Sequence, residues 1–407
     1  MTRANAAELC TNGGENEAKL AGPPGVGLGV VTGAPTALCE ARDRLGTWLT
    51  RYALPLWWER GADLAGGGFV DRLAQDGAPA RDYPKRVRVQ ARQAYVYGLA
   101  AAQGWMTGAD RAARHGLEGL AAMKASDGLY RPAQAREGVL DGMGVLYDQA
   151  FALLALATGF ATFQEPEFEQ EASALRDRLA AFAHPLGGFA EAPGLAAPLF
   201  ANPNMHLFES FQAWCATNCD SAWAELAAGQ ARLALERLID PNTGVLHEVY
   251  APNWRPLSAA DRMIWPGHLF EWGYLLLAWK GGGAAERAAG LRLIEAAERT
   301  GINRRGVAIF ALDGALNPIE RSARLWAQTE RMRATALAAS LTGEAGLWSA
   351  ALEASQTLEA FLETPTPGLW RDWMDEAGAV REEPAPASSF YHIVGAIAGL
   401  QRLLDGG

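Results

Sequence analysis

The sequence has few cysteines, and none of them has the spacing of a metal site. The four are Cys10, Cys39, Cys215 and Cys219. Cys215 and Cys219 stand one helical turn apart inside FESFQAWCATNC, a pattern typical of helix packing. We therefore expect a reducing, cytoplasmic location and no cysteine-ligated metal.

Two other absences limit the partners that this chain can have. No apolar stretch reaches the roughly 18 to 20 residues that a membrane helix needs, so no membrane span is predicted. The formal net charge is -10, and the basic residues are scattered instead of forming a stripe interleaved with aromatics. This distribution argues against nucleic acid and anionic membranes as partners.

The N-terminal segment differs in composition from the rest of the chain. Residues 1–36 are rich in Gly, Pro and Ala, and they carry acids where a secretory signal has Lys or Arg. We predict a disordered extension over residues 1–36 and one domain over residues 37–407. A single domain is favoured because a repeat runs without a break from near Gly68 to near Gly368.

That repeat has a period of about 60 residues. Along it a glycine is followed at once by an apolar residue, at Gly68-Phe69, Gly128-Leu129, Gly188-Phe189, Gly244-Val245, Gly306-Val307 and Gly368-Leu369. Out of phase with this series, polar clusters open apolar helical runs: VRVQARQAY, VLYDQAFAL, NPNMHLFESF, WPGHLFEWGY, RLWAQTERMR and SSFYHIVGAI. Two interleaved series predict six copies of one helical hairpin.

Amphipathic runs predict the second helix of each hairpin, at residues 37–59, 110–124, 167–183, 222–238, 284–299 and 346–363. A turn and a short β-prone stretch follow most of them. Because each hairpin buries its apolar face against its neighbours, we predict an all-α fold. Its simplest form is a closed ring with one set of helices inside and one outside.

The inner helices carry start signals. Asn202-Pro203 predicts an N-cap followed by proline at the first helical position, Pro266 opens the next helix, and Ser388-Ser389 predicts the last cap. In a ring of parallel inner helices all N-termini face one mouth, so polar residues of the first turns converge on one pocket. The candidates are Arg88, Arg92, Tyr147, Asp148, Asn202, His206, Glu209, His268, Glu271, Trp326, Gln328, Glu330, Tyr391 and His392.

Three of the six histidines belong to this set. Glu209 follows His206 by three residues, and Glu271 follows His268 by three, so each carboxylate can fix a tautomer or hold a substrate hydroxyl. His392, from another repeat, can approach His268 across the mouth. Two imidazoles, an arginine, carboxylates and aromatic faces suit a polyhydroxylated substrate that loses and regains a proton next to a carbonyl.

Each candidate also has a structural interpretation. His206 alone is equally well explained as a satisfied core residue, and Asn202 as a helix cap. Arg92 can pair with an acid, the glutamates can accept hydrogen bonds from helix starts, and Trp326 can belong to the core. The sequence contains no HExxH, HxH or CxxC motif, and the candidate ligands are spread over three repeats, so we predict neither metal nor cofactor.

These polar clusters resemble those of the N-acylglucosamine 2-epimerase superfamily. The matching strings are VQAR (Val89 to Arg92), NPNMHLFES (Asn202 to Ser210), PGHLFEW (Pro266 to Trp272), RLWAQTE (Arg324 to Glu330) and FYHIVGAI (Phe390 to Ile397). The resemblance implies an (α/α)6 barrel, metal-independent chemistry, and His268 and His392 as the acid/base pair. It also implies that Arg92 and His206 hold the carbonyl end of the opened sugar, in a pocket lined by Asn202, Tyr147, Glu209, Glu271, Trp326 and Glu330. We add Arg88 and Gln328 to these substrate-binding candidates.

One departure from the superfamily bears on the substrate. Many relatives carry a tryptophan four residues before the arginine of QAR, and this chain has Arg88 there, with Lys85 and Arg86 close by. These cations either hold a phosphate or sulfonate of the substrate, or pair with acids and face solvent. The sequence leaves both interpretations open.

The function that these residues predict is aldose-ketose isomerisation. One histidine removes the C2 proton of an opened hexose and returns it to C1 through a cis-enediol. Arg92, and His206 if protonated, would stabilise the oxyanion. NPNMHLFE and FYHIV resemble the isomerase branch, which includes mannose isomerase, and favour mannose and fructose or their 6-phosphates.

Other functions stay open at this stage. Return of the proton to the opposite face of C2 gives a sugar 2-epimerase of the N-acylglucosamine or cellobiose type. A glycoside hydrolase requires two carboxylates, which could come from among Asp148, Glu209, Glu271 and Glu330. A non-catalytic binding protein is a further alternative. We expect a small-molecule sugar or sugar phosphate as the partner, and a monomer or homodimer.

Overall fold

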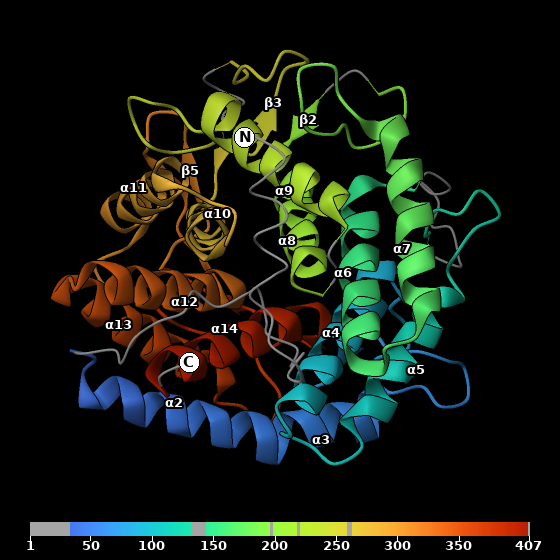
Figure 1. Ribbon diagram of the computed structural model, residues 1–407. Helices are drawn as coiled ribbons and strands as arrows, with labels where there is room; N and C mark the ends of the chain where they lie inside the picture. The colour runs from blue at the N-terminus through green and yellow to red at the C-terminus, as the bar shows by residue number, and fades with distance from the viewer. Residues whose placement is uncertain (1–32, 132–143, 196–197, 218–219, 259–262, 406–407) are drawn as a thin grey trace.

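The computed structural model describes residues 33–131, 144–195, 198–217, 220–258 and 263–405. Within these residues, inner helices form a ring in chain order: α4 (Val87–Ala102), α6 (Leu146–Phe163), α8 (Ala201–Thr217), α10 (Pro266–Ala278), α12 (Leu325–Thr342) and α14 (Phe390–Leu404). Each contacts the next, and α14 contacts α4, so the ring is closed (Figure 1). The predicted extension up to residue 32 lies outside the described residues.

An outer helix packs against each inner one. The outer helices are α2 (Thr36–Trp48), α5 (Ala109–Ala121), α7 (Pro166–Leu179), α9 (Ser221–Leu233), α11 (Ala284–Gly301) and α13 (Ala345–Leu362). Short helical segments extend three of them: Leu49–Ala53, α3 (Leu54–Leu56) and Trp57–Gly61 after α2, Ala180–Phe182 after α7, and Ala234–Leu238 after α9. The prediction of an all-α (α/α)6 barrel is confirmed.

The six glycines of the sequence period occupy one structural position. Each follows an outer helical segment with a positive φ, from +65° at Gly68 to +96° at Gly368. Residues with a Cβ rarely adopt this left-handed conformation. Space is also limited, because a Cβ on Gly368 would lie 2.8 Å from the carbonyl oxygen of Tyr52. The period therefore marks the turn that ends each outer helix.

Several of these turns are fixed by an amide side chain from the following inner helix. The Gln90 amide accepts a hydrogen bond from Phe69 N at 2.6 Å and donates one to Phe69 O at 2.9 Å. The same paired bonds join Gln149 to Tyr130, Asn204 to Phe189, and Gln328 to Ala308. These buried amides satisfy backbone groups that would otherwise be costly to bury, and they fix each turn relative to an inner helix.

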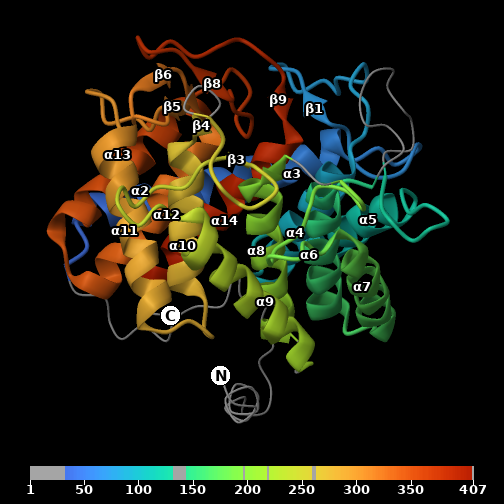
Figure 2. The same cartoon turned by 90° about the horizontal axis from the view of Figure 1, so that it is seen from above.

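Short antiparallel strands gather at one end of the ring (Figure 2). The pairs are β1 (Arg72–Leu73) with β9 (Ala385–Pro386), β2 (Leu199–Phe200) with β3 (Val249–Tyr250), and β7 (Ala323–Arg324) with β8 (Trp373–Met374). A three-stranded sheet joins β4 (Met263–Ile264), β5 (Ala311–Asp313) and β6 (Pro318–Glu320). Because β2, β4, β7 and β9 come shortly before α8, α10, α12 and α14, this end carries the N-termini of those inner helices.

The helix start signals were correct in one case and need correction in two. Pro266 is the first residue of α10, as predicted. Asn202 is not an N-cap, because α8 begins at Ala201 and Asn202 lies inside its first turn. Ser389 immediately precedes α14, but its hydroxyl donates to Asp372 Oδ1 at 2.6 Å instead of capping the helix.

The expectation that no segment has the length and hydropathy of a membrane helix is also corrected. α6 passes that test by length and composition, and most of it is buried in the structure. It is an inner helix that packs against α4 and α8. Its apolar character is explained by contacts on both sides within the ring.

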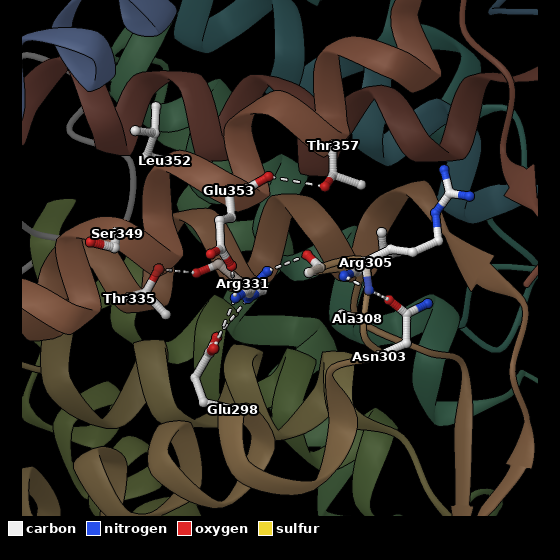
Figure 3. Close-up of polar contacts among 12 residues, drawn as sticks. Glu298, Asn303, Arg305, Ala308, Arg331, Thr335, Ser349, Leu352, Glu353 and Thr357 are labelled. Carbon is white, nitrogen blue, oxygen red and sulfur yellow. Dashed lines mark hydrogen bonds and ion pairs between the residues drawn. The ribbon is translucent and has the colours of Figure 1, made fainter. Parts of the chain in front are cut away.

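A buried arginine joins three helices on the outer side of the ring. Arg331 of α12 is 1% exposed. Its guanidinium donates to both carboxylate oxygens of Glu298 on α11, at 2.6 and 2.9 Å, and to Glu353 on α13 at 3.1 Å. It also donates to the carbonyl oxygen of Gly306 at 2.6 Å, in one of the left-handed turns (Figure 3). This one side chain therefore holds two outer helices and a turn.

Loss of the Arg331 cation should destabilise the fold. The acid partners Glu298 and Glu353 are 23% and 55% exposed, so they stay solvated when the cation is lost. Since a hydrogen bond to a charged group contributes about 1.5 to 3 kcal/mol, we expect Arg331→Met to lower the free energy of unfolding in urea by about that amount. Arg299→Ala is the control, because Arg299 forms an exposed pair with Glu295 on α11 and should change the value by less than about 1 kcal/mol. Equal effects of the two variants would contradict this interpretation of the cluster.

Candidate active site

Two histidines from distant parts of the sequence lie against one tryptophan. His268 is in the first turn of α10 and His392 in the first turn of α14. Their ring centroids lie 4.9 and 5.7 Å from that of Trp326, at the start of α12. The side chains are 4% and 7% exposed. The ring geometry has therefore brought together the histidines of the fourth and the last hairpin.

Each of these imidazoles is held through Nδ1 by a carboxylate. Nδ1 of His268 lies 2.8 Å from Oε2 of Glu248, and Nδ1 of His392 lies 2.8 Å from Oε1 of Glu330. An ionised acceptor places the proton on Nδ1 and leaves Nε2 as the basic atom. Neither Nε2 makes a hydrogen bond to a described residue. Burial, with the Arg92 cation next, lowers the pKa of His392, so this ring is neutral at pH 7.

Glu248 was not among the candidates predicted from the sequence, where Glu271 was expected to pair with His268. Glu248 lies immediately before β3, in the stretch GVLHEVY, and its side chain is 5% exposed. In the sequence, Glu248 is only an acid in a β-prone segment, away from the polar clusters that open the inner helices. Its contact with α10 depends on how the strand layer folds over the helix ends.

His206 forms a third pair, with the glutamate that the sequence predicted. Its Nδ1 lies 3.2 Å from Oε2 of Glu209, and the Tyr391 hydroxyl donates to Oε1 of the same carboxylate. Burial lowers the pKa of His206 to about 4. The suggestion that a protonated His206 stabilises an oxyanion is therefore corrected for neutral pH. As a neutral ring bound through Nδ1, it offers Nε2 as an acceptor for a hydroxyl.

Arg92 is a buried cation without an acid partner among the described residues. It donates to the Ser388 carbonyl oxygen at 2.9 Å and to the Tyr147 hydroxyl at 2.8 Å. Its guanidinium carbon lies 4.1 Å from the centroid of Phe151 and 5.1 Å from that of Tyr391. Because no described carboxylate neutralises it directly, its charge remains available to a developing oxyanion.

A cluster of buried acids lies beside the histidines. Glu271 and Glu330 are fully buried, and Arg333 approaches both: its Nε donates to Oε2 of Glu330, and its Nη2 lies 3.6 Å from Oε1 of Glu271. Burial raises the pKa of Glu271, with Glu330 as the next cause, and burial raises the pKa of Glu330 to about 7. Arg333 was missed at the sequence level, although it follows Glu330 by three residues.

The three cations near the start of α4 are paired with acids. Nε of Arg88 lies 3.0 Å from Oδ1 of Asp148. Nε of Arg86 lies 2.6 Å from Oδ1 of Asp71. Nζ of Lys85 lies 2.7 Å from Oδ2 of Asp63. Glu191 adds another acid beside them, and its pKa is raised to about 7 by burial and then by Asp148. Of the two interpretations that the sequence left open, the structure favours paired cations over a free anion site.

The remaining candidates divide between the mouth and the core. Asn202 has a buried Oδ1 with no hydrogen-bond partner among the described residues, and Tyr147 packs on His206 at a centroid distance of 5.2 Å. Gln328 is fully buried, and its amide is occupied by Ala308 and by the Arg324 carbonyl. We therefore omit Gln328 from the proposed sugar site and assign it to the turn.

Two sets of described residues could hold a metal ion. They are His206 with Glu209 and Glu271, and Glu271 with Glu330 and His392, each with ligand atoms within 4.8 Å of one another. Arg333 binds Glu330 and lies near Glu271, and its positive charge opposes a cation there. The prediction of a site without metal thus needs a direct test.

The comparisons with known proteins identify an enzyme of the isomerase and epimerase class and its family. The family profile described as N-acylglucosamine 2-epimerase (GlcNAc 2-epimerase) matches residues 67–396, and the chain belongs to this family. It is 39% identical over 378 residues to a mannose-6-phosphate isomerase of Rhizobium meliloti (strain 1021), covering 88% of this chain and 96% of that protein.

One further relative and one solved structure are similar to this chain. A D-mannose isomerase of Thermobifida fusca is 27% identical over 348 residues, which cover 75% of this chain and 81% of that protein. The solved structure of cellobiose 2-epimerase from Spirochaeta thermophila DSM 6192 superposes with a TM-score of 0.80 at 19% identity, covering 91% of this chain and 99% of that one. The structural likeness supports the barrel fold.

The neutral state of His206 can be measured directly. We expect the ring of His206 in the folded protein to titrate with a pKa near 4, because its burial penalises the charged form. The measurement is a pH titration of 15N-labelled histidine by NMR, with the signal assigned from a His206→Gln variant. A midpoint at pH 6 or above would contradict the buried, neutral ring.

Proposed function

We propose that this protein interconverts mannose and fructose by histidine-mediated proton transfer through a cis-enediol. The observation that carries the proposal is the pair of imidazoles, His268 and His392, packed on Trp326 with their Nδ1 atoms on carboxylates. Both rings keep Nε2 for the substrate, and the Arg92 cation and His206 pack on the same ring, that of Phe151. The names of the two isomerase relatives support the same substrate class.

The chemistry follows from these atoms. With the hexose opened to its aldehyde form, Nε2 of one histidine takes the C2 proton, and the C–H electrons form the C1–C2 double bond of the enediolate. The former carbonyl oxygen gains negative charge, which Arg92 stabilises, and it is protonated to give the cis-enediol. Loss of the O2 proton and return of a proton to C1 complete the ketose. His206 accepts a hydrogen bond from a sugar hydroxyl through Nε2.

A 2-epimerase is the second candidate, and one observation favours it. His268 and His392 come from different helices and both pack on Trp326, so each can serve a different face of C2. Returning the proton to C2 from the second histidine inverts that carbon. A glycoside hydrolase has less support, because Glu209, Glu271 and Glu330 are fully or almost fully buried, and Asp148 is paired with Arg88.

The electrostatics of the mouth favour the free sugar over its 6-phosphate. Lys85, Arg86 and Arg88 are each paired with a carboxylate, and Glu191 places a further acid next to Arg88. A phosphate dianion would have to displace an acid there. The name of the Rhizobium meliloti relative supports the phosphorylated sugar as the alternative substrate. We retain the expectations of a cytoplasmic monomer or homodimer.

The mechanism predicts hydrogen exchange at the sugar. With mannose in deuterated water, we expect fructose to form with deuterium at C1, as followed by 1H NMR. His268→Ala and His392→Ala should each lower kcat by at least about 100-fold, since each removes an acid/base group. His184→Ala is the control, because His184 lies in the turn after α7, outside the predicted pocket. Full turnover in both active-site variants would refute the assigned roles, and glucose appearing in place of fructose would identify the epimerase.

Substrate charge and metal dependence have a separate test. We expect kcat/KM for mannose to exceed that for mannose 6-phosphate by about tenfold or more, equivalent to about 1.4 kcal/mol. Asp148→Asn should narrow this ratio, because it frees the Arg88 cation. EDTA should leave the rate with mannose unchanged. A preference for the phosphate in the unmodified protein, or loss of activity with EDTA that Zn²⁺ or Mn²⁺ restores, would overturn the corresponding part of the proposal.

A further inference from the structure

Arg333 is placed behind the catalytic pair instead of beside the substrate. It lies on α12 one turn after Glu330 and is 2% exposed. Its guanidinium carbon lies 4.3 Å from the centroid of Tyr274 on α10. Gly395 of α14 would place a Cβ 3.7 Å from Nη1 of Arg333. The side chain is therefore enclosed between three inner helices.

Its polar contacts form a chain that ends at His392. Arg333 donates from Nε to Oε2 of Glu330, while Oε1 of Glu330 binds Nδ1 of His392 at 2.8 Å. Each oxygen of the Glu330 carboxylate is thus used by one partner. Nη2 of Arg333 also lies 3.6 Å from Glu271 Oε1, so the same cation faces the second buried acid.

The protonation state of Glu330 determines which nitrogen of His392 is basic. An ionised carboxylate accepts from Nδ1–H and leaves the lone pair on Nε2. A protonated carboxyl group would instead donate to Nδ1 and favour the tautomer with the proton on Nε2. Only the first tautomer can take a proton from C2 of a sugar through Nε2.

Glu330 lies where ionisation is unfavourable. It is fully buried, with Glu209 and Glu271 nearby. Burial raises the pKa of Glu330 to about 7, and Arg333 is the largest influence in the opposite direction. Without that cation the pKa would rise further, and the carboxyl group would be protonated at neutral pH.

We propose that Arg333 is a positioning residue: its charge keeps Glu330 ionised and so holds His392 in the tautomer whose Nε2 accepts a proton. The catalytic consequence rests on the proposed function, whereas the tautomer of His392 does not. The charged or titratable groups that face Glu330 and His392 are Arg92 on α4, His206 and Glu209 on α8, His268, Glu271 and Tyr274 on α10, Arg333 on α12, and Tyr391 on α14.

The expected pH dependence of kcat/KM follows from the contacts that link Arg333, Glu330 and His392. In the unmodified protein, kcat/KM should fall as the pH drops below about 7, because Glu330 becomes protonated. In Arg333→Met this acid limb of the pH profile should move to higher pH by at least about one unit, with kcat/KM at pH 7 reduced by about fivefold or more and recovering towards pH 9. Arg333→Lys retains the charge and should keep the limb within about half a unit of its original position.

Arg331→Met provides a matched control, since Arg331 lies on the same helix, is equally buried, and binds acids of the outer layer (Figure 3). It should lose stability without any shift of the acid limb. The tautomer is measured independently of turnover by 15N NMR of labelled histidine, with the signal assigned from His392→Gln. We expect Nδ1–H in the unmodified protein at pH 8, and Nε2–H in Arg333→Met at pH 7.

The outcomes separate the two proposals. An unchanged tautomer and an unchanged acid limb in Arg333→Met overturn the positioning role. If the unmodified protein converts no hexose, the proposed function fails, and the NMR comparison still decides the role of Arg333. If Arg333→Met does not fold, Arg333→Gln takes its place as the neutral variant, and equal pH profiles of Arg333→Gln and Arg333→Lys would refute the need for charge.

Discussion

The structure depends on pairing several buried charged groups with one another inside a closed helical ring. A carboxylate at the centre of such a ring is costly unless a cation or an imidazole binds it. Glu330 is supported by Arg333 and His392, and Glu209 by His206 and Tyr391. The same bonds that make these acids tolerable also fix the imidazole tautomers. Stability and catalytic readiness therefore have one physical origin here.

The closed ring explains how residues far apart in sequence share one pocket. Inner helices of similar orientation bring their N-terminal turns to the same end, where the short strands lie. Each turn before an inner helix is fixed by a left-handed glycine, and several are fixed by a buried amide such as Gln90 or Gln328. These supports determine where each inner helix begins, and so how its first-turn side chains meet those of its neighbours.

The fold was largely predictable from sequence because it repeats. A glycine that needs a positive φ leaves a local signal six times, and amphipathic periodicity locates the outer helices within a few residues. The side-chain pairs within the candidate site were harder to predict from the sequence. Glu248 binds His268 from the strand layer, and Arg333 binds Glu330 of its own helix. Gln328 lies in the first turn of an inner helix, as the site residues do, but its amide binds the backbone of a turn. Periodicity gives the end of the ring at which a residue lies, not which neighbour it binds.

The two arginines of α12 show why that distinction matters. Arg331 and Arg333 are two residues apart and equally buried, yet Arg331 faces the outer helices and Arg333 faces the buried acids of the candidate site. Residues two apart on a helix differ in direction by about 200°, so they cannot share a surface. The same type of ion pair thus contributes to cohesion between helices on one side of α12. On the other side, Arg333 binds the carboxylate that accepts from His392, which is why we propose that it controls the tautomer of that ring.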